Sequence, residues 1–435
     1  MSFPVAVKTV LFFAVHSILQ LCIATATPPS TLPMPARGSE AAETPNIRGG
    51  EGAFSIMIVG DSITQGHEGD WTWRYRLWEW FNNEGIAVDF VGPFLGTFPP
   101  DSDIDGHAET MSNSIPSPGV PPTGPAITFG RYAVGINKNF DSNHFGAWGR
   151  QLALDRDLIH SMVQAYNPEY LLVLLGFNDL AWYPYFSPED LLDNMHSFVH
   201  QARTAKPNTK FLIGNIPQRL RIEDRPELAI RTDKYNELLA DAIPSWSTRN
   251  SPVALVKMRE LYACDLDACP AGYDGLHPNA LGEYQIAQAF SRTLVESFQI
   301  GSSELVFSPA ADLPVRPLPV PQNLTAVSNA TGVFVTWDPT FGVLGYQVRH
   351  RMLGEDTWNV LYVSTSNKFY TKWRFGGDEE WEYMVQAING IDPNTTWGEW
   401  SNKVSSCTPS EVLLSQPRQG RLTHWYRGHL GCSWR

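Results

Sequence analysis

The chain has 435 residues, of which 43% are hydrophobic and 18% charged, and its formal net charge is −13. This length predicts two domains, each with a core large enough to fold without metal support. The acidic balance argues against nucleic acid as a partner and against docking on anionic lipid, because both need concentrated Lys and Arg.

Residues 1–26 have the pattern of a secretory signal peptide. Lys8 supplies a positive charge, Thr9–Ile23 is largely apolar, and residues 24–26 (Ala-Thr-Ala) offer a small-x-small cleavage site. The apolar run is short for a membrane span, so no stable membrane insertion is expected. The segment predicts a secreted, extracellular protein, and its retention as an anchor is the alternative.

The cysteines fit an exported protein. Four of the five follow the signal segment: Cys264, Cys269, Cys407 and Cys432. These four allow three connectivities, and Cys264–Cys269 is favoured because its short loop closes locally. Asn-x-Ser/Thr sequons, which suit a secreted surface, lie at Asn323, Asn329 and Asn394.

Residues 27–52 are rich in Pro, Ala and Ser, which predicts a flexible leader. Over residues 53–300, short apolar runs alternate with longer helical patterns, which predicts an α/β domain with a parallel sheet. The expected strands are Ser55–Val59, Ala87–Val91, Tyr170–Leu175, Lys210–Gly214 and Val253–Lys257. The expected helices are Trp71–Asn82, Arg150–Ala165, Pro188–Thr204, Arg231–Ile243 and Asn279–Phe298.

One segment, Phe94–Phe145, interrupts this alternation and is rich in Gly, Pro, Ser and Asn. Such long loops inside a compact domain are usually functional. Because it ends just before a glycine-containing motif described below, it is expected to border the active site.

The composition and the hydrophobic pattern change in the C-terminal part of the chain. Residues 301–320 are predicted to form a Pro-rich linker, which stiffens a connection. Over residues 321–409 the apolar pattern has a period of two, interrupted by Gly, Asn and Asp turns, which predicts a small all-β sandwich. The tail, residues 410–435, is basic and has no predicted fold.

Three short motifs carry candidate chemistry. Residues 60–64 (Gly-Asp-Ser-Ile-Thr) place Ser62 at the end of the first expected strand, where open α/β sheets bind ligands. Residues 176–179 (Gly-Phe-Asn-Asp) follow the most apolar strand, and the Asn178 amide suits a developing oxyanion. Taken singly, both motifs are also typical of ordinary strand-ending turns.

The third motif is residues 274–278 (Asp-Gly-Leu-His-Pro), just before the last expected helix. His277 suits a general base that activates a hydroxyl, and Asp274 lies close enough in sequence to orient the imidazole. The alternative is that Asp274 caps the helix and His277 is a surface residue.

In this order, the three motifs resemble those of the SGNH/GDSL hydrolase family over about Phe54–Phe298. The resemblance implies a flavodoxin-like three-layer α/β/α domain that acts as a serine esterase without metal or organic cofactor. It implies that Ser62 is the nucleophile, His277 the general base and Asp274 its orienting carboxylate.

The resemblance also implies an oxyanion hole made of the Ser62 N–H, the Asn178 side chain and a glycine N–H. Residues 144–149 (His-Phe-Gly-Ala-Trp-Gly) look like the block that supplies the glycine. Gly149 is preferred and Gly146 is the alternative. Asp179 is expected to support the Asn178 loop rather than to react.

The motif combination looks most similar to secreted carbohydrate esterases, so acetylated polysaccharide is the expected ester substrate. Aromatic residues that suit sugar stacking are Trp71, Trp73, Trp78, Trp80, Trp148, Trp182 and Tyr183, of which at least half are expected to be core. The alternatives are a lipid-directed esterase and a non-catalytic glycan- or wall-binding protein.

Over about Pro321–Pro409 the chain resembles a fibronectin type III domain, with Trp337 and Tyr383 at expected core positions. Such a domain can contact a cell wall or polymer, but a glycosylated spacer is the favoured interpretation. If it is a spacer, removal of residues 321–435 should leave activity on a small soluble ester unchanged.

Overall fold

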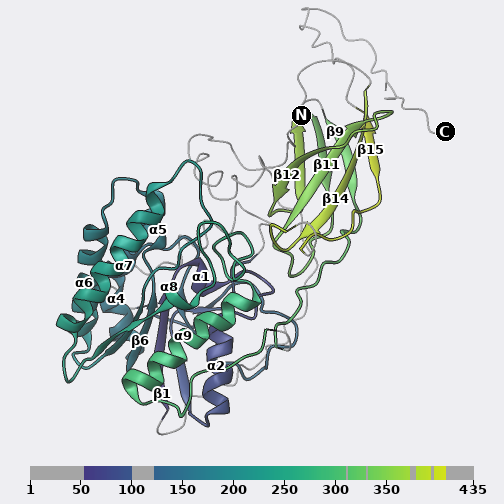
Figure 1. The fold of residues 1–435 in the computed structure, drawn as a ribbon. Helices are drawn as coiled ribbons and strands as arrows, with labels where there is room; N and C mark the ends of the chain where they lie inside the picture. The colour runs from purple at the N-terminus through teal and green to yellow at the C-terminus, as the bar shows by residue number, and fades with distance from the viewer. Residues whose placement is uncertain are drawn as a thin grey trace, which may run out of the picture.

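The computed structural model describes residues 53–99, 122–309, 312–329, 332–372, 379–392 and 396–407. The predicted signal peptide, leader and basic tail lie outside these ranges, as do Asn394, Cys432 and the inner part of the predicted inserted loop. The described residues form an α/β unit followed by an all-β unit (Figure 1). Within the described ranges, no helix combines the length and apolarity that a membrane crossing requires.

A parallel sheet forms the centre of the α/β unit, with the strand order β2-β1-β6-β7-β8. Its strands are β1 (Phe54–Gly60), β2 (Val88–Val91), β6 (Tyr170–Leu174), β7 (Lys210–Gly214) and β8 (Val253–Val256), and β5 (Phe145–Gly146) pairs with the end of β1. All five residues of β6 are buried, as a strand covered on both faces requires. The order is that of the flavodoxin-like doubly wound sheet.

Helices cover both faces of this sheet (Figure 1). Helices α2 (Trp73–Asn83) and α9 (Ala280–Phe298) lie on one side, and α4 (Leu152–Tyr166), α6 (Pro188–Ala205) and α7 (Glu227–Trp246) lie on the other. The short helices are α1 (Ser62–Gln65), α5 (Phe177–Trp182) and α8 (Met258–Leu261). The three-layer α/β/α fold predicted from the sequence is confirmed.

Most helix ends lie within two residues of those predicted, and two boundaries are informative. Helix α7 begins before Arg231 and continues through Pro244, where the sequence predicted its end. The start of α9 is set by Asn279, whose side-chain oxygen accepts the N–H groups of Leu281 and Gly282. Asp274 therefore does not cap this helix, and it remains available to His277.

The inserted segment contains short strands rather than loop alone. Strands β3 (Phe94–Leu95) and β4 (Ile127–Thr128) pair in parallel. The N–H of Phe98 donates to the Gly66 carbonyl at 2.8 Å, and the Phe98 ring lies 4.7 Å from the ring of Trp148. The described part of this segment thus borders the loop that follows Ser62, as predicted.

The core of the α/β unit extends past the predicted boundary at residue 300. Leu305 is buried in that core, and the Trp80 indole N–H donates to the Ser303 carbonyl at 2.9 Å. The first part of the predicted linker therefore packs on α2 and belongs to the α/β unit, because it carries apolar side chains that the core accommodates.

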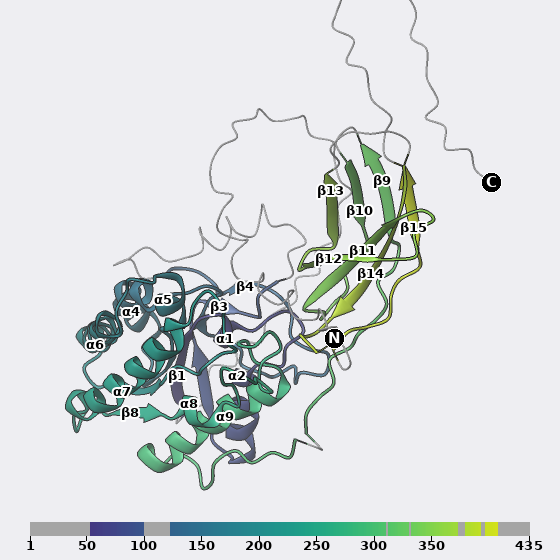
Figure 2. The same cartoon turned by 45° about the horizontal axis from the view of Figure 1, so that its top comes forward.

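Two antiparallel sheets make up the second unit (Figure 2). One sheet contains β13 (Lys368–Lys372), β10 (Gly332–Thr336) and β9 (Thr325–Asn329), and the other contains β12 (Asn359–Ser364), β11 (Gly345–Met352), β14 (Glu380–Ile388) and β15 (Val404–Cys407). Trp337, Tyr346 and Tyr383 are buried between them. The predicted all-β sandwich is confirmed.

Candidate active site

The structure brings the three predicted triad residues together. Ser62 begins α1 directly after β1, and His277 lies in the turn before α9. His277 Nε2 is 2.8 Å from Ser62 Oγ, and His277 Nδ1 is 2.7 Å from Asp274 Oδ2. Residues 215 positions apart in the chain thus form one hydrogen-bonded series.

The two oxygens of the Asp274 carboxylate have separate roles. Oδ1 accepts the backbone N–H groups of Leu276 at 3.0 Å and His277 at 2.8 Å, which closes the turn. Oδ2 is left to face the imidazole. A single side chain therefore both shapes the turn and fixes the ring that follows it.

Charge and burial tune this pair for base catalysis. Burial alone would raise the pKa of Asp274, but the His277 imidazole and the N–H donors lower it to about 2. Burial alone would lower the pKa of His277, but the Asp274 carboxylate raises it above its ordinary value. An ionised carboxylate keeps the proton on Nδ1, so Nε2 accepts the Ser62 hydroxyl proton.

Two backbone N–H groups, those of Ser62 and Gly149, are candidate oxyanion donors. Among the described residues, none accepts a hydrogen bond from the N–H of Ser62 or of Gly149. The N–H of Gly146, in contrast, donates to His144 Nδ1 at 3.0 Å. This difference favours Gly149 over Gly146 as the glycine donor. Gly149 has a φ of +72°, and a Cβ there would meet the Trp182 ring at 2.8 Å, so the position needs glycine.

Asn178 provides the third donor. Its Nδ2 gives one proton to the Arg150 carbonyl at 2.9 Å, and an amide nitrogen carries two protons. Asp179 next to it accepts the N–H groups of Leu152 at 2.8 Å and Ala153 at 3.1 Å, at the start of α4. Asp179 thus ties the Asn178 loop to the helix that follows Gly149, in agreement with its expected supporting role.

Sequence reasoning missed Arg74, which holds the loop after the nucleophile in place. The side chain is fully buried and donates to four backbone carbonyls: those of Thr64, Gln65, Gly96 and Ser142. No sequence signal marked this role, since an arginine in a helical pattern normally faces solvent.

Aromatic residues divide between the core and the site. Trp73 and Trp80 are core residues, whereas Trp182 and Tyr183 expose 41% and 54% of their surface. The Trp148 ring stacks on His277, with the ring centroids 4.7 Å apart and the planes 15° apart. Trp148, next to Gly149 in the chain, and Trp182, whose ring lies against Gly149, therefore remain as candidate site residues.

The predicted Cys264–Cys269 disulfide is formed and lies beside the catalytic turn. Cys264 Sγ is 3.4 Å from the Gly275 carbonyl, and a Cβ on Gly272 would meet Cys269 Sγ at 2.7 Å. Within the described ranges, no three His, Cys, Asp or Glu side chains gather as metal ligands would.

Comparison with known proteins finds a family match over part of the α/β unit. Residues 116–284 match the model of the GDSL-like Lipase/Acylhydrolase family, and this range includes Asn178, Asp274 and His277. This stretch of the α/β unit is therefore similar to a GDSL/SGNH hydrolase domain. Ser62 precedes the matched range, and the fold brings it to the other members of the site.

Similar proteins include a multidomain esterase of Ruminococcus flavefaciens, 24% identical over 255 residues. That match covers 56% of this chain and 29% of the relative, so the chain spans less than a third of its length. A carbohydrate esterase family 3 structure from Talaromyces cellulolyticus is 23% identical, with 57% of this chain and 100% of that chain covered and a TM-score of 0.39. The FN5 domain of Drosophila Lar is 21% identical, with 22% of this chain and 100% of that domain covered and a TM-score of 0.19.

Proposed function

We propose that this protein is a serine esterase that hydrolyses carboxylic esters through an acyl-enzyme. The observation that carries the proposal is the continuous series Asp274 Oδ2, His277 Nδ1, His277 Nε2 and Ser62 Oγ, with contacts of 2.7 and 2.8 Å. The proposed oxyanion donors are the N–H groups of Ser62 and Gly149, which have no acceptor among the described residues, and the second amide proton of Asn178.

The mechanism follows from these positions. Ser62 Oγ attacks the ester carbonyl carbon while His277 Nε2 takes the hydroxyl proton, and Asp274 stabilises the imidazolium that forms. The three donors stabilise the negative charge on the former carbonyl oxygen. His277 then protonates the leaving alcohol. Water, deprotonated by His277, attacks the acyl-enzyme, and the acid is released with Ser62 restored.

The proposed substrate is an acylated carbohydrate, with an acetylated polysaccharide as the expected natural form. Trp182 supports this choice, because it lies against Gly149 and exposes 41% of its surface, so an indole face beside the oxyanion donors can stack on a sugar. The similarity to a carbohydrate esterase family 3 protein also favours this class.

Secretion is part of the proposal. The signal-peptide pattern of residues 1–26 supports it, and the Cys264–Cys269 disulfide suits an oxidising compartment. The sequon residues Asn323 and Asn329 are exposed, which suits glycosylation in such a compartment.

Hydrolysis of a p-nitrophenyl ester series, from acetate to long acyl chains, tests the proposal. Wild-type protein should cleave acetate best, and Ser62→Ala should be inactive with an unchanged unfolding temperature, because only a small hydroxyl is lost. Ser245→Ala, which removes an exposed hydroxyl on α7, is the matched control and should retain full activity.

Other outcomes discriminate between the alternatives. A preference for long acyl chains would support the lipid-directed alternative. A wild-type protein that cleaves no ester and resists a serine-directed fluorophosphonate would contradict the proposal and favour a binding protein.

A further inference from the structure

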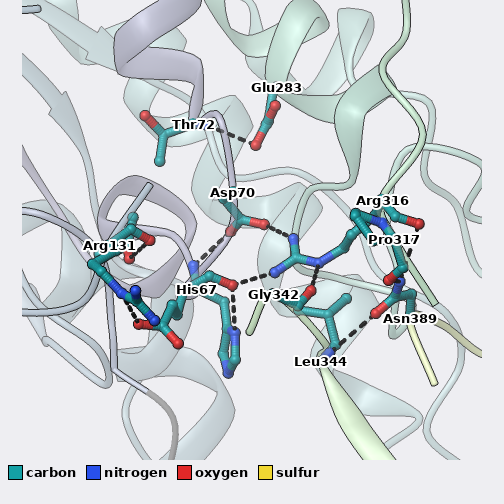
Figure 3. A network of polar contacts seen from close by, with 12 residues as sticks. His67, Asp70, Thr72, Arg131, Glu283, Arg316, Pro317, Gly342, Leu344 and Asn389 are labelled. Carbon is teal, nitrogen blue, oxygen red and sulfur yellow. Dashed lines mark hydrogen bonds and ion pairs between the residues drawn. The ribbon is translucent and has the colours of Figure 1, made fainter. Parts of the chain in front are cut away.

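The loop that follows the nucleophile helix, residues 66–70, is fixed by its own hydrogen bonds. The His67 N–H donates to Asp70 Oδ2 at 2.5 Å, and the Asp70 N–H donates back to the His67 carbonyl at 2.9 Å (Figure 3). The His67 ring meets Trp148 edge-on at 6.1 Å, and Trp148 stacks on His277. A movement of this loop would therefore shift Trp148, which contacts the catalytic imidazole.

Arg316, from the predicted linker, contacts this loop from one side, and the N–H groups of Glu68 and Gly69 donate to the carbonyls of Phe98 and Arg131 on the other. The Arg316 guanidinium forms an ion pair with Asp70 Oδ1 and donates to the carbonyls of Glu68 and Gly342 (Figure 3). The side chains of Arg316 and Asp70 are only 18% and 5% exposed. A pair this protected from solvent has a defined geometry, unlike a surface salt bridge.

The all-β unit holds Arg316 in place from the other side. Asn389, which follows β14, donates from Nδ2 to the Pro317 carbonyl at 2.9 Å and to the Arg316 carbonyl at 3.4 Å. Its Oδ1 accepts the Leu344 N–H at 3.2 Å. The buried Asn389 side chain thus joins the linker to two segments of the sandwich.

The backbones of the two units also touch directly at glycines. Gly69 has a φ of +86°, and a Cβ there would lie 2.5 Å from the Cα of Gly342. Only glycine permits this approach. Next to it, the Arg131 guanidinium lies over the Phe341 ring at 4.4 Å.

A second contact reaches the turn that carries Asp274 and His277. The N–H of Ile391, in the loop after β14, donates to the Tyr273 carbonyl at 3.1 Å. Tyr273 in turn donates its N–H to the His277 carbonyl at 2.9 Å, and its ring stacks on His277 at 5.7 Å. The sandwich therefore contacts both loops that present the triad.

We propose that the all-β unit is a structural part of the active site and not a spacer: it contacts the catalytic turn through Ile391 and supports the 66–70 loop through Arg316 of the linker, which Asn389 and Gly342 hold in place. Arg316 is a positioning residue: it acts through the 66–70 loop and touches no reacting atom. This inference rests on the proposed esterase function for the meaning of the braced loops. It leads to the opposite of the expectation that removal of residues 321–435 leaves activity unchanged.

The charges around Arg316 explain why its loss should displace the loop. Glu283 on α9 accepts the Thr72 N–H at 2.7 Å (Figure 3). Burial first, and then the nearby Asp70 carboxylate, raise the pKa of Glu283. Without the guanidinium, the buried Asp70 carboxylate would lose its cationic partner beside a second carboxyl group. Movement of the loop toward solvent would relieve this cost.

The test uses the full chain and compares Arg316→Gln, Arg316→Lys and Arg292→Gln. Arg292 on α9 pairs with Glu304 and so also joins a helix of the α/β unit to the segment that follows it, away from the triad loops. On p-nitrophenyl acetate, Arg316→Gln should lower kcat by roughly 10- to 100-fold, because small misplacements of reacting groups have effects of this size. KM should change much less. Arg316→Lys should recover part of the loss, and Arg292→Gln should match wild type.

Hydrogen exchange provides a readout that does not depend on catalysis. Amides of residues 66–70 and the Ile391 amide should exchange faster in Arg316→Gln than in wild type, and those of Arg292→Gln should not. If Arg316→Gln does not fold, Asn389→Ala should show the same pattern with a smaller amplitude, since no buried charge loses its partner.

The outcomes separate the two proposals. A folded Arg316→Gln protein with wild-type kcat and wild-type exchange overturns the brace. A wild-type protein that hydrolyses no ester overturns the esterase proposal. The exchange measurement alone then shows whether Arg316 holds the 66–70 loop in place.

Discussion

The Asn178 amide engages Arg150 with one proton and keeps the other for a ligand. Asn178→Ala should therefore lower kcat by roughly 10²- to 10³-fold, the usual effect of removing one oxyanion donor, with a much smaller change in KM. Steady-state kinetics on p-nitrophenyl acetate measure this effect. Asn82→Ala, which removes an exposed amide on α2, should retain wild-type kcat; equal losses in both variants would refute the role of Asn178.

The pH dependence of kcat/KM should report His277. The base must be neutral to act, and Asp274 raises its pKa above the ordinary value of 6.5, so activity should rise with pH and reach half its maximum above pH 6.5. In Asp274→Asn the negative charge is gone and burial dominates, so the midpoint should move to lower pH. The maximal rate should also fall, by roughly 10⁴-fold, because the tautomer is no longer fixed. A midpoint that does not move would contradict this coupling.

At the residue scale, the sequence predicted what short motifs can encode. Ser62, Asn178, Asp274 and His277 each follow a strand or precede a helix, and the parallel fold gathers those ends. The sequence preferred Gly149 and left Gly146 open, and the structure adds a reason for Gly149 that sequence could not give, because the Gly146 N–H already has an acceptor. The sequence did not indicate the role of Arg74, because its partners are backbone carbonyls, which every residue type carries.

At the scale of elements, Arg74 connects the loop after α1 to the inserted segment through its hydrogen bonds. Arg74→Met should lower the free energy of unfolding by about 3 kcal/mol or more, because several buried carbonyls lose their donor. Denaturant titration measures this change. The comparison variant Arg156→Met, which removes a partly exposed ion pair with Asp157, should cost about 1 kcal/mol or less. Similar losses in the two variants would argue against a special role for Arg74.

At the element scale, helices and strands followed the hydrophobic period closely, and the misses have local causes. Helix α7 runs through Pro244, because a proline near the end of a helix removes only a hydrogen bond that a fraying turn can spare. The inserted segment hides β3 and β4, since two-residue strands leave no periodic pattern. The sequence placed the end of the α/β unit before Leu305, because a single buried side chain produces no periodic pattern that could be recognised.

The whole molecule should unfold as one unit. The buried Arg316–Asp70 pair and the Ile391–Tyr273 hydrogen bond link the two units across their boundary. Wild-type protein should therefore show one calorimetric transition, and Arg316→Gln should show two, because units with a weakened interface unfold separately. Two transitions already present in wild type would contradict the link. Sequence could predict both units, but a contact between residues 246 positions apart has no local signature.

The Trp148 indole, stacked on His277, has a consequence for the charge that appears during turnover. Each time Ser62 gives up its proton, the imidazole becomes a cation held against the face of an aromatic ring, and such a face attracts cations by about 0.5–2 kcal/mol. The quadrupole of the Trp148 ring thus stabilises the imidazolium together with the Asp274 carboxylate. A protonated imidazole also quenches indole emission, so the contribution of Trp148, one of 15 tryptophans in the chain, should fall when His277 becomes protonated.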